Sequence, residues 1–346
     1  MTNISSNMKM VTVVSIVAVV IGLVSWFFML NGGASAVGFN DRSPWGLLIA
    51  AFLFFEAVAS GALFAGALLK NKSLLALGLG AAAAAGFAIV ADLGAPFAIW
   101  ALIFTPNIHA PMMLDVWFLT LNMVFGALMF FNISTNITRN VLLVVSVLLP
   151  VGTAWMITSL PGAPGWMSSI EIPLLLIEVA IVGCAVAYVL DKTEVIKTPF
   201  IIALGSFLVI SVAEHLKFVY ALPASNESIF FAAFDSLYQI VYWGMIAICI
   251  LLPLVMLITK KGTPAIIATL SFVGVFVSKA LLIEKGNLLP YEHFGNAFVS
   301  NELMFNNNII SIPPTSTLEV LVILGSFGLM CVVAMFLTAI PQRKSA

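Results

Sequence analysis

The sequence predicts an all-α, polytopic membrane protein with about ten transmembrane helices. Of its 346 residues, 62% are hydrophobic and only 8% are charged, and the mean hydropathy is +1.15. A soluble domain typically carries about 25% charged residues, and no domain of this size has a core that could bury so much apolar surface in water. The net charge of −1 gives no indication of binding to nucleic acid or to acidic substrates.

Each helix is predicted from an apolar run that is long enough to cross the bilayer. A hydrocarbon core about 30 Å thick needs roughly 20 apolar residues per helix. The runs that qualify are residues 10–30, 45–69, 74–96, 112–133, 141–160, 170–190, 198–221, 236–259, 264–284 and 317–340. Short connections predict that neighbouring helices pack antiparallel. The first run resembles a signal peptide, with Lys9 before it and Ala-Ser-Ala at 34–36 after it, but its length favours a retained helix.

The orientation of the chain is predicted from its basic residues, which gather in cytoplasmic loops. One set of helix ends carries Lys9, Lys70, Lys72, Arg139, Lys192, Lys197, Lys260, Lys261, Arg343 and Lys344. The opposite loops carry Arg42 and Lys285, while Lys217 and Lys279 fall within spans. This bias, together with the even number of spans, predicts that both termini are cytoplasmic.

The third run contains an aspartate and a helix break. Residues 74–104 would make a straight helix of about 46 Å, too long for the hydrocarbon core. Pro96 cannot donate a backbone hydrogen bond and disfavours helical geometry in the residue before it. We therefore expect the helix to break near residues 94–96, which leaves Asp92 in the outer third of the membrane. Residues 97–104 are expected to form a short interfacial helix, with Trp100 at headgroup depth.

Most polar residues within the spans fall in the half of the membrane away from the basic ends. They are Glu56, Asp92, Asp115, Asn122, Glu171, Glu178, Glu214, His215, Lys217, Asp235, Tyr238, Gln239, Tyr242, Lys279, Glu284 and Glu319. Each ionisable group in a membrane costs about 3 kcal/mol even on a lenient scale. The sequence therefore predicts that these groups line an outward-opening cavity or pair with one another.

Several of these residues also have structural explanations. Glu214 and Lys217 are three residues apart and could neutralise each other. Helix capping or a helix-dipole interaction could account for the acidic residues at the starts of spans, namely Asp115, Asp235 and Glu319. Tyr238 and Tyr242 could be interfacial aromatic residues, and His109 a solvated loop residue. Glu56 and Asp92 have no evident local partner, which makes them the leading functional candidates.

Three separated segments resemble the NrfD/polysulfide-reductase family of membrane subunits. They are "PWGLLIAAFLFFEAVASGALFAGALL" (44–69), "ADLGAPFAIWALIFTPNIHAPMMLDVWFL" (91–119) and "PPTSTLEVLVILGSFG" (313–328). The resemblance implies two four-helix bundles with an extra helix at each end. The corresponding regions here are residues 1–40, 41–160 (first bundle), 161–285 (second bundle) and 286–346.

The resemblance also implies a quinone site near the outer face of the first bundle, with menaquinone or ubiquinone as the bound substrate. Asp92, His109, Asp115 and Asn122 fall at or near the matching segments, and Glu56 lies on the first bundle helix. The implied partners are a ferredoxin-like iron–sulfur subunit on the outer face and a molybdopterin-type catalytic subunit, in a prokaryotic cytoplasmic membrane. The family usually has arginine where this chain has Ala95.

These observations suggest roles for individual residues in quinol oxidation. A carboxylate in a low-dielectric site takes up a proton more readily than one in water. We expect Glu56 or Asp92 to accept quinol protons, and His109, Asp115 and Asn122 to bind the quinone or relay protons. Docking of the partner is expected on the outer loop 285–316. Candidates for a proton relay in the second bundle are Glu178, Glu214, Lys217, Tyr238 and Lys279.

The residues also leave two other functions open. A secondary transporter has broken helices and intramembrane charges too, but those lie near the midplane, whereas here they lie outward. A b-type haem anchor would need axial histidines, for which only His109 and His215 are candidates in or near the membrane. Cys184, Cys249 and Cys331 are far apart and show no CxxC spacing, so we expect no metal site or iron–sulfur cluster on this chain. The resemblance implies that the chain binds no haem.

Overall fold

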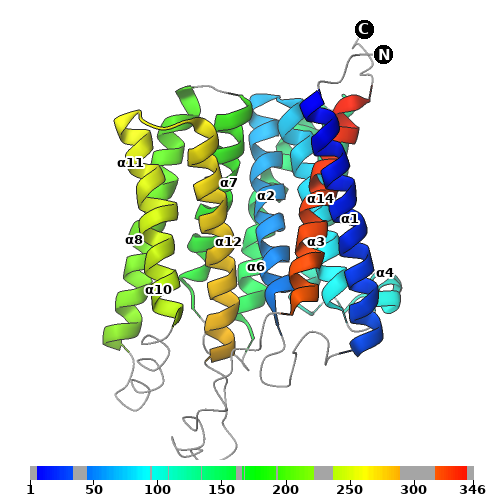
Figure 1. Cartoon of the computed structure of the whole chain (residues 1–346), viewed down its shortest axis with the longest axis horizontal. Coiled ribbons are helices and arrows are strands. Elements are labelled where there is room, and N and C mark those ends of the chain that lie inside the picture. The colour runs from blue at the N-terminus through cyan, green and yellow to red at the C-terminus, as the bar shows by residue number, and fades with distance from the viewer. Residues whose placement is uncertain are drawn as a thin grey trace, which may run out of the picture.

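The computed structural model is a bundle of long, roughly parallel helices (Figure 1). It describes residues 6–33, 45–93, 96–107, 109–133, 135–160, 166, 168–191, 194–221, 237–288 and 316–340. Ten helices within these residues are long and apolar enough to cross a membrane. The predicted all-helical, polytopic class is therefore confirmed.

The ten spans include one that is divided into three segments. The helices are α1 (Ser6–Gly32), α2 (Leu47–Leu69), α3 (Lys72–Asp92), α4 (Trp100–Phe104), α5 (Met112–Phe130), α6 (Asn136–Thr158), α7 (Glu171–Leu190), α8 (Lys197–Ala221), α10 (Leu237–Gly244), α11 (Leu252–Thr259), α12 (Pro264–Leu288) and α14 (Thr317–Ala339). Between α10 and α11, residues Met245–Leu251 form a π-helix. Pro253 follows this segment and has no N–H to donate to the carbonyl of Cys249.

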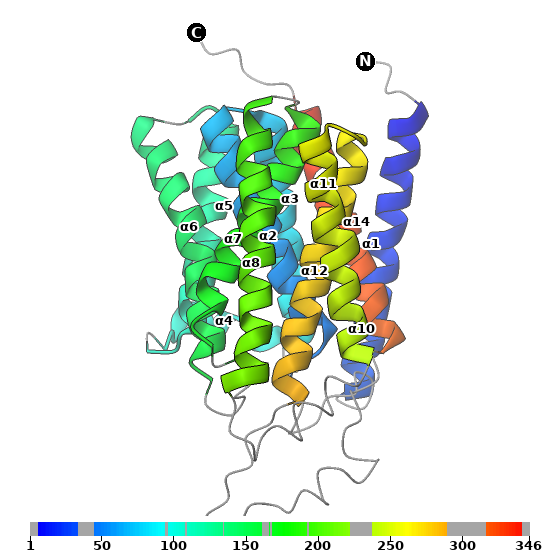
Figure 2. The ribbon, with the colours of Figure 1, turned by 90° about the vertical axis from the view of Figure 1, so that its left-hand side faces the viewer.

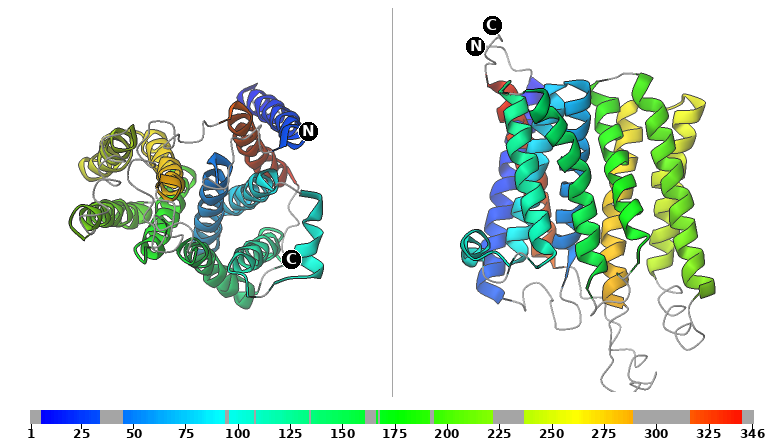
Figure 3. Two further views of the ribbon diagram at one scale, coloured as in Figure 1. Left: turned by 90° about the horizontal axis from the view of Figure 1, so that it is seen from below. Right: turned by 180° about the vertical axis from the view of Figure 1, so that it is seen from behind.

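The spans form two four-helix groups (Figure 3, left). The first contains α2, α3, α5 and α6, and the second contains α7, α8, the α10–α11 span and α12. Helix α14 packs on α3, and α1 lies against α14 at the edge of the molecule (Figure 2). This arrangement has the two four-helix bundles and the flanking helices that the resemblance implies.

The two groups meet where α2 crosses α7. A Cβ atom on Gly61 would lie 2.5 Å from the carbonyl oxygen of Val179 and 2.8 Å from the backbone nitrogen of Gly183. Backbone is therefore in contact with backbone, which only glycine permits here. Such close approach through small residues is a common means of packing helices in membranes.

Substituting Gly61 with alanine is expected to destabilise the folded protein by about 1–3 kcal/mol, because the added methyl group must push α2 away from α7. The matched control is Gly205→Ala in α8, where an added Cβ would meet no atom within 4 Å. The control should be neutral or slightly stabilising, since alanine favours helix more than glycine does. The thermal unfolding midpoints of the two purified variants are compared. Equal midpoints for Gly61→Ala and Gly205→Ala would contradict the tight contact between α2 and α7.

The third span ends where proline predicts. Helix α3 ends at Asp92, Leu93 is extended, and Pro96–Ala98 form a 3₁₀ turn that precedes α4. Figure 1 shows α4 at the edge of the bundle, and Figure 3 shows that it runs across the bundle axis. Trp100 and Phe104 are exposed, as expected of an interfacial helix. Residues 94 and 95, including the position that departs from the family, lie outside the described residues.

One end of the bundle carries most of the described basic residues. This basic face contains Lys70, Lys72, Arg139, Lys197, Lys260 and Lys261, and it is the upper end in Figure 1. Helix α1 begins and α14 ends at the same face (Figure 2). We call the opposite end the far face; it is the one that the sequence predicts to lie outside the cell.

Candidate functional site

Two buried carboxyl groups meet in the first bundle. Glu56 from α2 and Asp115 from α5 are 2% and 3% exposed, and both contact the hydroxyl of Thr153 from α6. The Thr153 oxygen lies 3.0 Å from Oδ1 of Asp115 and is hydrogen bonded to Oε1 of Glu56. Three helices thus converge on one hydroxyl group.

The Glu56–Thr153–Asp115 cluster has more acceptor oxygens than hydrogens to donate, so it can bind a proton. The Thr153 oxygen has three acceptors around it, since the carbonyl oxygen of Leu149 is also only 3.1 Å away. A hydroxyl group has a single hydrogen to donate. The two carboxyl contacts are therefore both hydrogen bonds only when one carboxyl group is protonated and donates to the Thr153 oxygen.

The second oxygen of each carboxyl group has no hydrogen-bond partner among the described residues. Oε2 of Glu56 and Oδ2 of Asp115 are buried and have no hydrogen bond within the described part of the chain. Gly152 lies beside the site: a Cβ there would be 3.3 Å from Oδ1 of Asp115. Buried polar atoms usually find partners, so these two oxygens are available to a ligand that can donate hydrogen bonds.

A second polar layer lies closer to the basic face. Pro150 cannot donate to the carbonyl of Ser146, and the hydroxyl of Ser60 donates to that carbonyl instead. The Ser146 hydroxyl in turn donates to Oδ1 of Asn122 at 2.7 Å. Nδ2 of Asn122 donates to the carbonyls of Phe118 (3.0 Å) and Val145 (3.2 Å). The bond to Phe118 lies within α5, whereas the bonds to Val145 and Ser146 hold α5 against α6.

Asp92 and His109 are not joined to this cluster. Asp92 is the last residue of α3, and its Oδ1 is buried without a hydrogen-bond partner among the described residues. It lies within electrostatic reach of Glu319 on α14. His109 is exposed in the turn before α5, where its backbone N–H donates to Oδ1 of Asn107. Of the five residues predicted for the quinone site, the structure thus brings Glu56 and Asp115 together and places Asn122 in the neighbouring polar layer.

Glu319 caps the start of α14, as predicted by the alternative that acidic residues at the starts of spans are helix caps. Its carboxylate accepts from the backbone N–H of Ser316 at 2.9 Å, within a capping box at the start of α14. Asp115, by contrast, reaches across to α6 instead of capping α5. The third acidic residue of that prediction, Asp235, lies outside the described residues.

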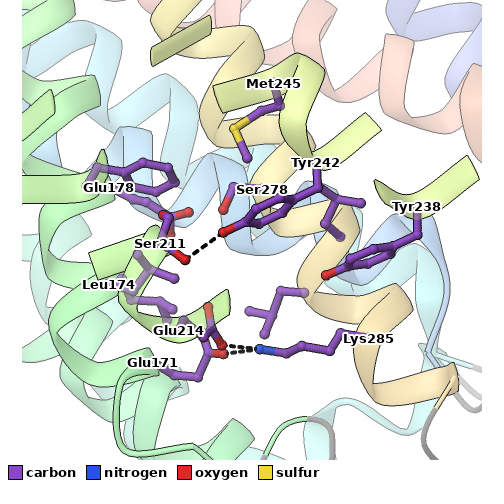
Figure 4. Close-up of a pocket in the computed structure, with 14 residues that line it drawn as sticks. Glu171, Leu174, Glu178, Ser211, Glu214, Tyr238, Tyr242, Met245, Ser278 and Lys285 are labelled. Carbon is purple, nitrogen blue, oxygen red and sulfur yellow. Dashed lines mark hydrogen bonds and ion pairs between the residues drawn. The ribbon is translucent and has the colours of Figure 1, made fainter. Parts of the chain in front are cut away.

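The second bundle contains a network of buried ion pairs (Figure 4). Lys285 from α12 contacts Glu171 of α7 at 2.5 Å and Glu214 of α8 at 2.6 Å. Lys279 pairs with Glu178 about two helical turns along α7. The prediction that Lys285 belongs to an outer loop is wrong, because α12 continues to Leu288 and carries this lysine into the bundle. Glu214 is paired with Lys285, and the side chain of Lys217 lies outside the described residues.

A small cavity of about 30 Å³ lies within this network. It is lined by Glu171, Glu178, Glu214 and Lys285 and by two tyrosines, Tyr238 and Tyr242. The Tyr242 hydroxyl donates to the carbonyl of Ser211 at 2.8 Å, and the Tyr238 ring stacks on the Tyr242 ring with centroids 6.3 Å apart. The tyrosines thus face a polar interior, not only the interface.

A known protein shares part of this sequence. No protein-family model matches the chain. Over 119 residues it is 31% identical to a protein of Halobacterium salinarum described as a putative membrane subunit of dimethyl sulfoxide reductase. The predicted resemblance to NrfD-like membrane subunits is confirmed. The match covers 32% of this chain and 27% of the relative, so the chain spans about a quarter of the relative's length in this match.

Residues that were not predicted from the sequence complete the clusters in both bundles. Thr153 and Ser146 on α6 are seven residues apart, the same spacing as Asp115 and Asn122 on α5. Pro150 lies between them and leaves the carbonyl of Ser146 without its usual partner within the helix. Ser60, which donates to that carbonyl, lies one turn from Glu56. This matched spacing on successive helices was a usable signal. No comparable signal placed Lys285 between Glu171 and Glu214.

Proposed function

We propose that the chain is the membrane anchor subunit of a respiratory oxidoreductase and exchanges electrons and protons with membrane quinol near its far face. Electrons then pass to a ferredoxin-like iron–sulfur subunit docked on that face, and from there to a molybdopterin-type catalytic subunit. The host membrane is a prokaryotic cytoplasmic membrane, with the basic face in the cytoplasm. The description of the relative as part of a reductase in a membrane supports the first part of this proposal.

The observation that carries the proposal is the carboxyl pair that shares the Thr153 hydroxyl. Quinol oxidation releases two protons and two electrons, and the ring oxygens need hydrogen-bond partners while the protons leave. Oε2 of Glu56 and Oδ2 of Asp115 are free to accept from a quinol hydroxyl. The pair itself already accommodates one exchangeable proton, which suits general-base chemistry.

The location of the site also supports this function. Asp115 stands in the first turn of α5 at the far face, and Glu56 lies near the middle of α2. Trp117 and Leu121 expose the outer side of α5 to the bilayer, from which quinol would arrive. In this proposal the chain holds no haem, metal or cluster, because its cysteines and histidines lack the spacing of ligand sets.

Purification of the native assembly tests the proposal. We expect a tagged chain, extracted from its own membranes in mild detergent, to retain bound quinone and an iron–sulfur subunit. Adding quinol anaerobically should reduce the clusters, as read by electron paramagnetic resonance. Glu56→Gln should retain the partner but slow this reduction. An assembly with no iron–sulfur subunit, or one whose clusters quinol does not reduce, would refute the function.

A further inference from the structure

The cavity in the second bundle is surrounded by an unequal number of acidic and basic groups. Three carboxyl groups, Glu171, Glu178 and Glu214, share two ammonium groups, Lys279 and Lys285. Their side chains are all at most 10% exposed. If every group were ionised, the cluster would hold one uncompensated negative charge.

An uncompensated charge at this depth is costly. Removing a carboxylate from water costs several kcal/mol unless a counter-charge and hydrogen bonds replace the solvent. Lys285 already serves two carboxyl groups, and Lys279 serves the third. Among the described side chains, these five groups are therefore neutral together only if one further positive charge is taken up.

Two oxygen atoms show where that charge would be held. Oε2 of Glu171 and Oε1 of Glu178 are buried without a hydrogen-bond partner among the described residues, and both residues line the cavity. A volume of about 30 Å³ is large enough for a water molecule. Figure 4 shows Glu178 and Met245 toward one end of this space and the Glu171–Lys285–Glu214 cluster at the other.

We propose that this cavity is a proton-binding site that holds one exchangeable proton, carried by the Glu171, Glu178 and Glu214 carboxyl groups with a water molecule. Glu171 and Glu178 stand two helical turns apart on α7 and line the cavity in which the water would be held, and each has an oxygen without a hydrogen-bond partner among the described residues. A dehydrated metal cation suits the space less well, because the Lys285 ammonium group already occupies the position between two of the carboxylates.

Other titratable groups face this cluster and belong to its charge balance. Glu284 of α12 and His215 of α8 lie beside it, and the His215 ring stacks on Tyr242 with centroids 5.7 Å apart. Lys279 also lies within electrostatic reach of Glu56 in the first bundle. Glu284 is a further acidic group and increases the need for a proton. His215 is a base beside Glu214 and is a second group on which a proton can be held.

Infrared spectroscopy of the full chain in lipid nanodiscs, without quinol, tests the proposal. A protonated carboxyl group has a C=O band that shifts in D₂O, and ¹³C-labelled glutamate separates it from aspartate bands. Glu171→Gln is expected to remove the intensity of one protonated glutamate, because two carboxylates and two ammonium groups balance. Glu178→Gln should do the same and provides an independent variant. The control is Glu194→Gln, at an exposed residue of the basic face, which should leave the intensity of the protonated carboxyl band unchanged.

A double variant that restores the excess of one carboxylate should restore the band of the protonated glutamate. In Glu171→Gln/Lys285→Met, two carboxylates share one ammonium group, so the lost band should return. Unchanged intensity in Glu171→Gln and Glu178→Gln would overturn the proposal, since all three groups would then be ionised. A thermal stabilisation by Na⁺ over choline that disappears in Glu171→Gln would also overturn it, because the cavity would then hold a metal cation.

Discussion

Replacing Glu56 with glutamine is expected to reduce quinol oxidation by the assembled complex about 100-fold or more, the typical contribution of a positioned general base. Glutamine preserves the shape of the side chain and can still bond to Thr153, but it cannot accept a proton. The structural change is therefore small and the chemical change large. Steady-state oxidation of a soluble quinol analogue, with KM and kcat determined separately, measures the effect; the loss should fall mainly on kcat.

Two further variants locate the base. Asp191→Asn changes a carboxylate at the basic face, where it accepts from Asn71, and should leave turnover unchanged. Asp92→Asn tests the alternative carboxylate at the end of α3. If Asp92→Asn abolished turnover while Glu56→Gln did not, the proton acceptor would be Asp92 and the first-bundle cluster would be structural.

The Glu56–Asp115 pair is also expected to behave as a unit. Because the two carboxyl groups share the Thr153 hydroxyl, removing either one disrupts the same proton site. The double variant Glu56→Gln/Asp115→Asn should be hardly less active than the worse single variant, as for other residues that act together. Independent, multiplying losses would show that the two groups act on different steps.

Replacing Lys285 with methionine is expected to destabilise the protein by about 3–5 kcal/mol, because it leaves Glu171 and Glu214 buried without their cation. Methionine fills similar volume, so lost packing contributes little. Unfolding of the purified chain in detergent, followed by heat or denaturant, measures the loss. Lys261→Met, at an exposed lysine of the basic face, is the matched control and should be neutral.

Removing the carboxylates together with the lysine should restore much of that stability. A buried ion pair or triad can often be replaced by neutral groups at little cost, whereas removal of one partner is expensive. The triple variant Lys285→Met/Glu171→Gln/Glu214→Gln is therefore expected to unfold closer to the unmodified protein than Lys285→Met does. A triple variant as unstable as the single one would show that Lys285 contributes through packing instead of charge.

Several features of the fold could be predicted from the sequence because they depend on local properties. Hydropathy over about 20 residues identified ten spans, and Pro96 located the end of α3 to within a few residues. Some ends differ: the run at 141–160 begins earlier, at Asn136, because Thr135 caps the helix with Thr138, and the run at 264–284 continues to Leu288. Helix ends depend on capping groups and neighbours that hydropathy does not register.

The sequence by itself determined that this chain is a multi-pass helical bundle with its titratable residues concentrated away from the basic face. Apolar length and charge position are properties of single segments, and the bilayer converts them directly into topology. Only the tertiary structure decided which of those residues meet. It placed Thr153 between Glu56 and Asp115, and Lys285 between Glu171 and Glu214. The physical reason is that such contacts depend on the rotation and close packing of neighbouring helices, which small residues such as Gly61 and Gly183 set at the crossing of α2 and α7.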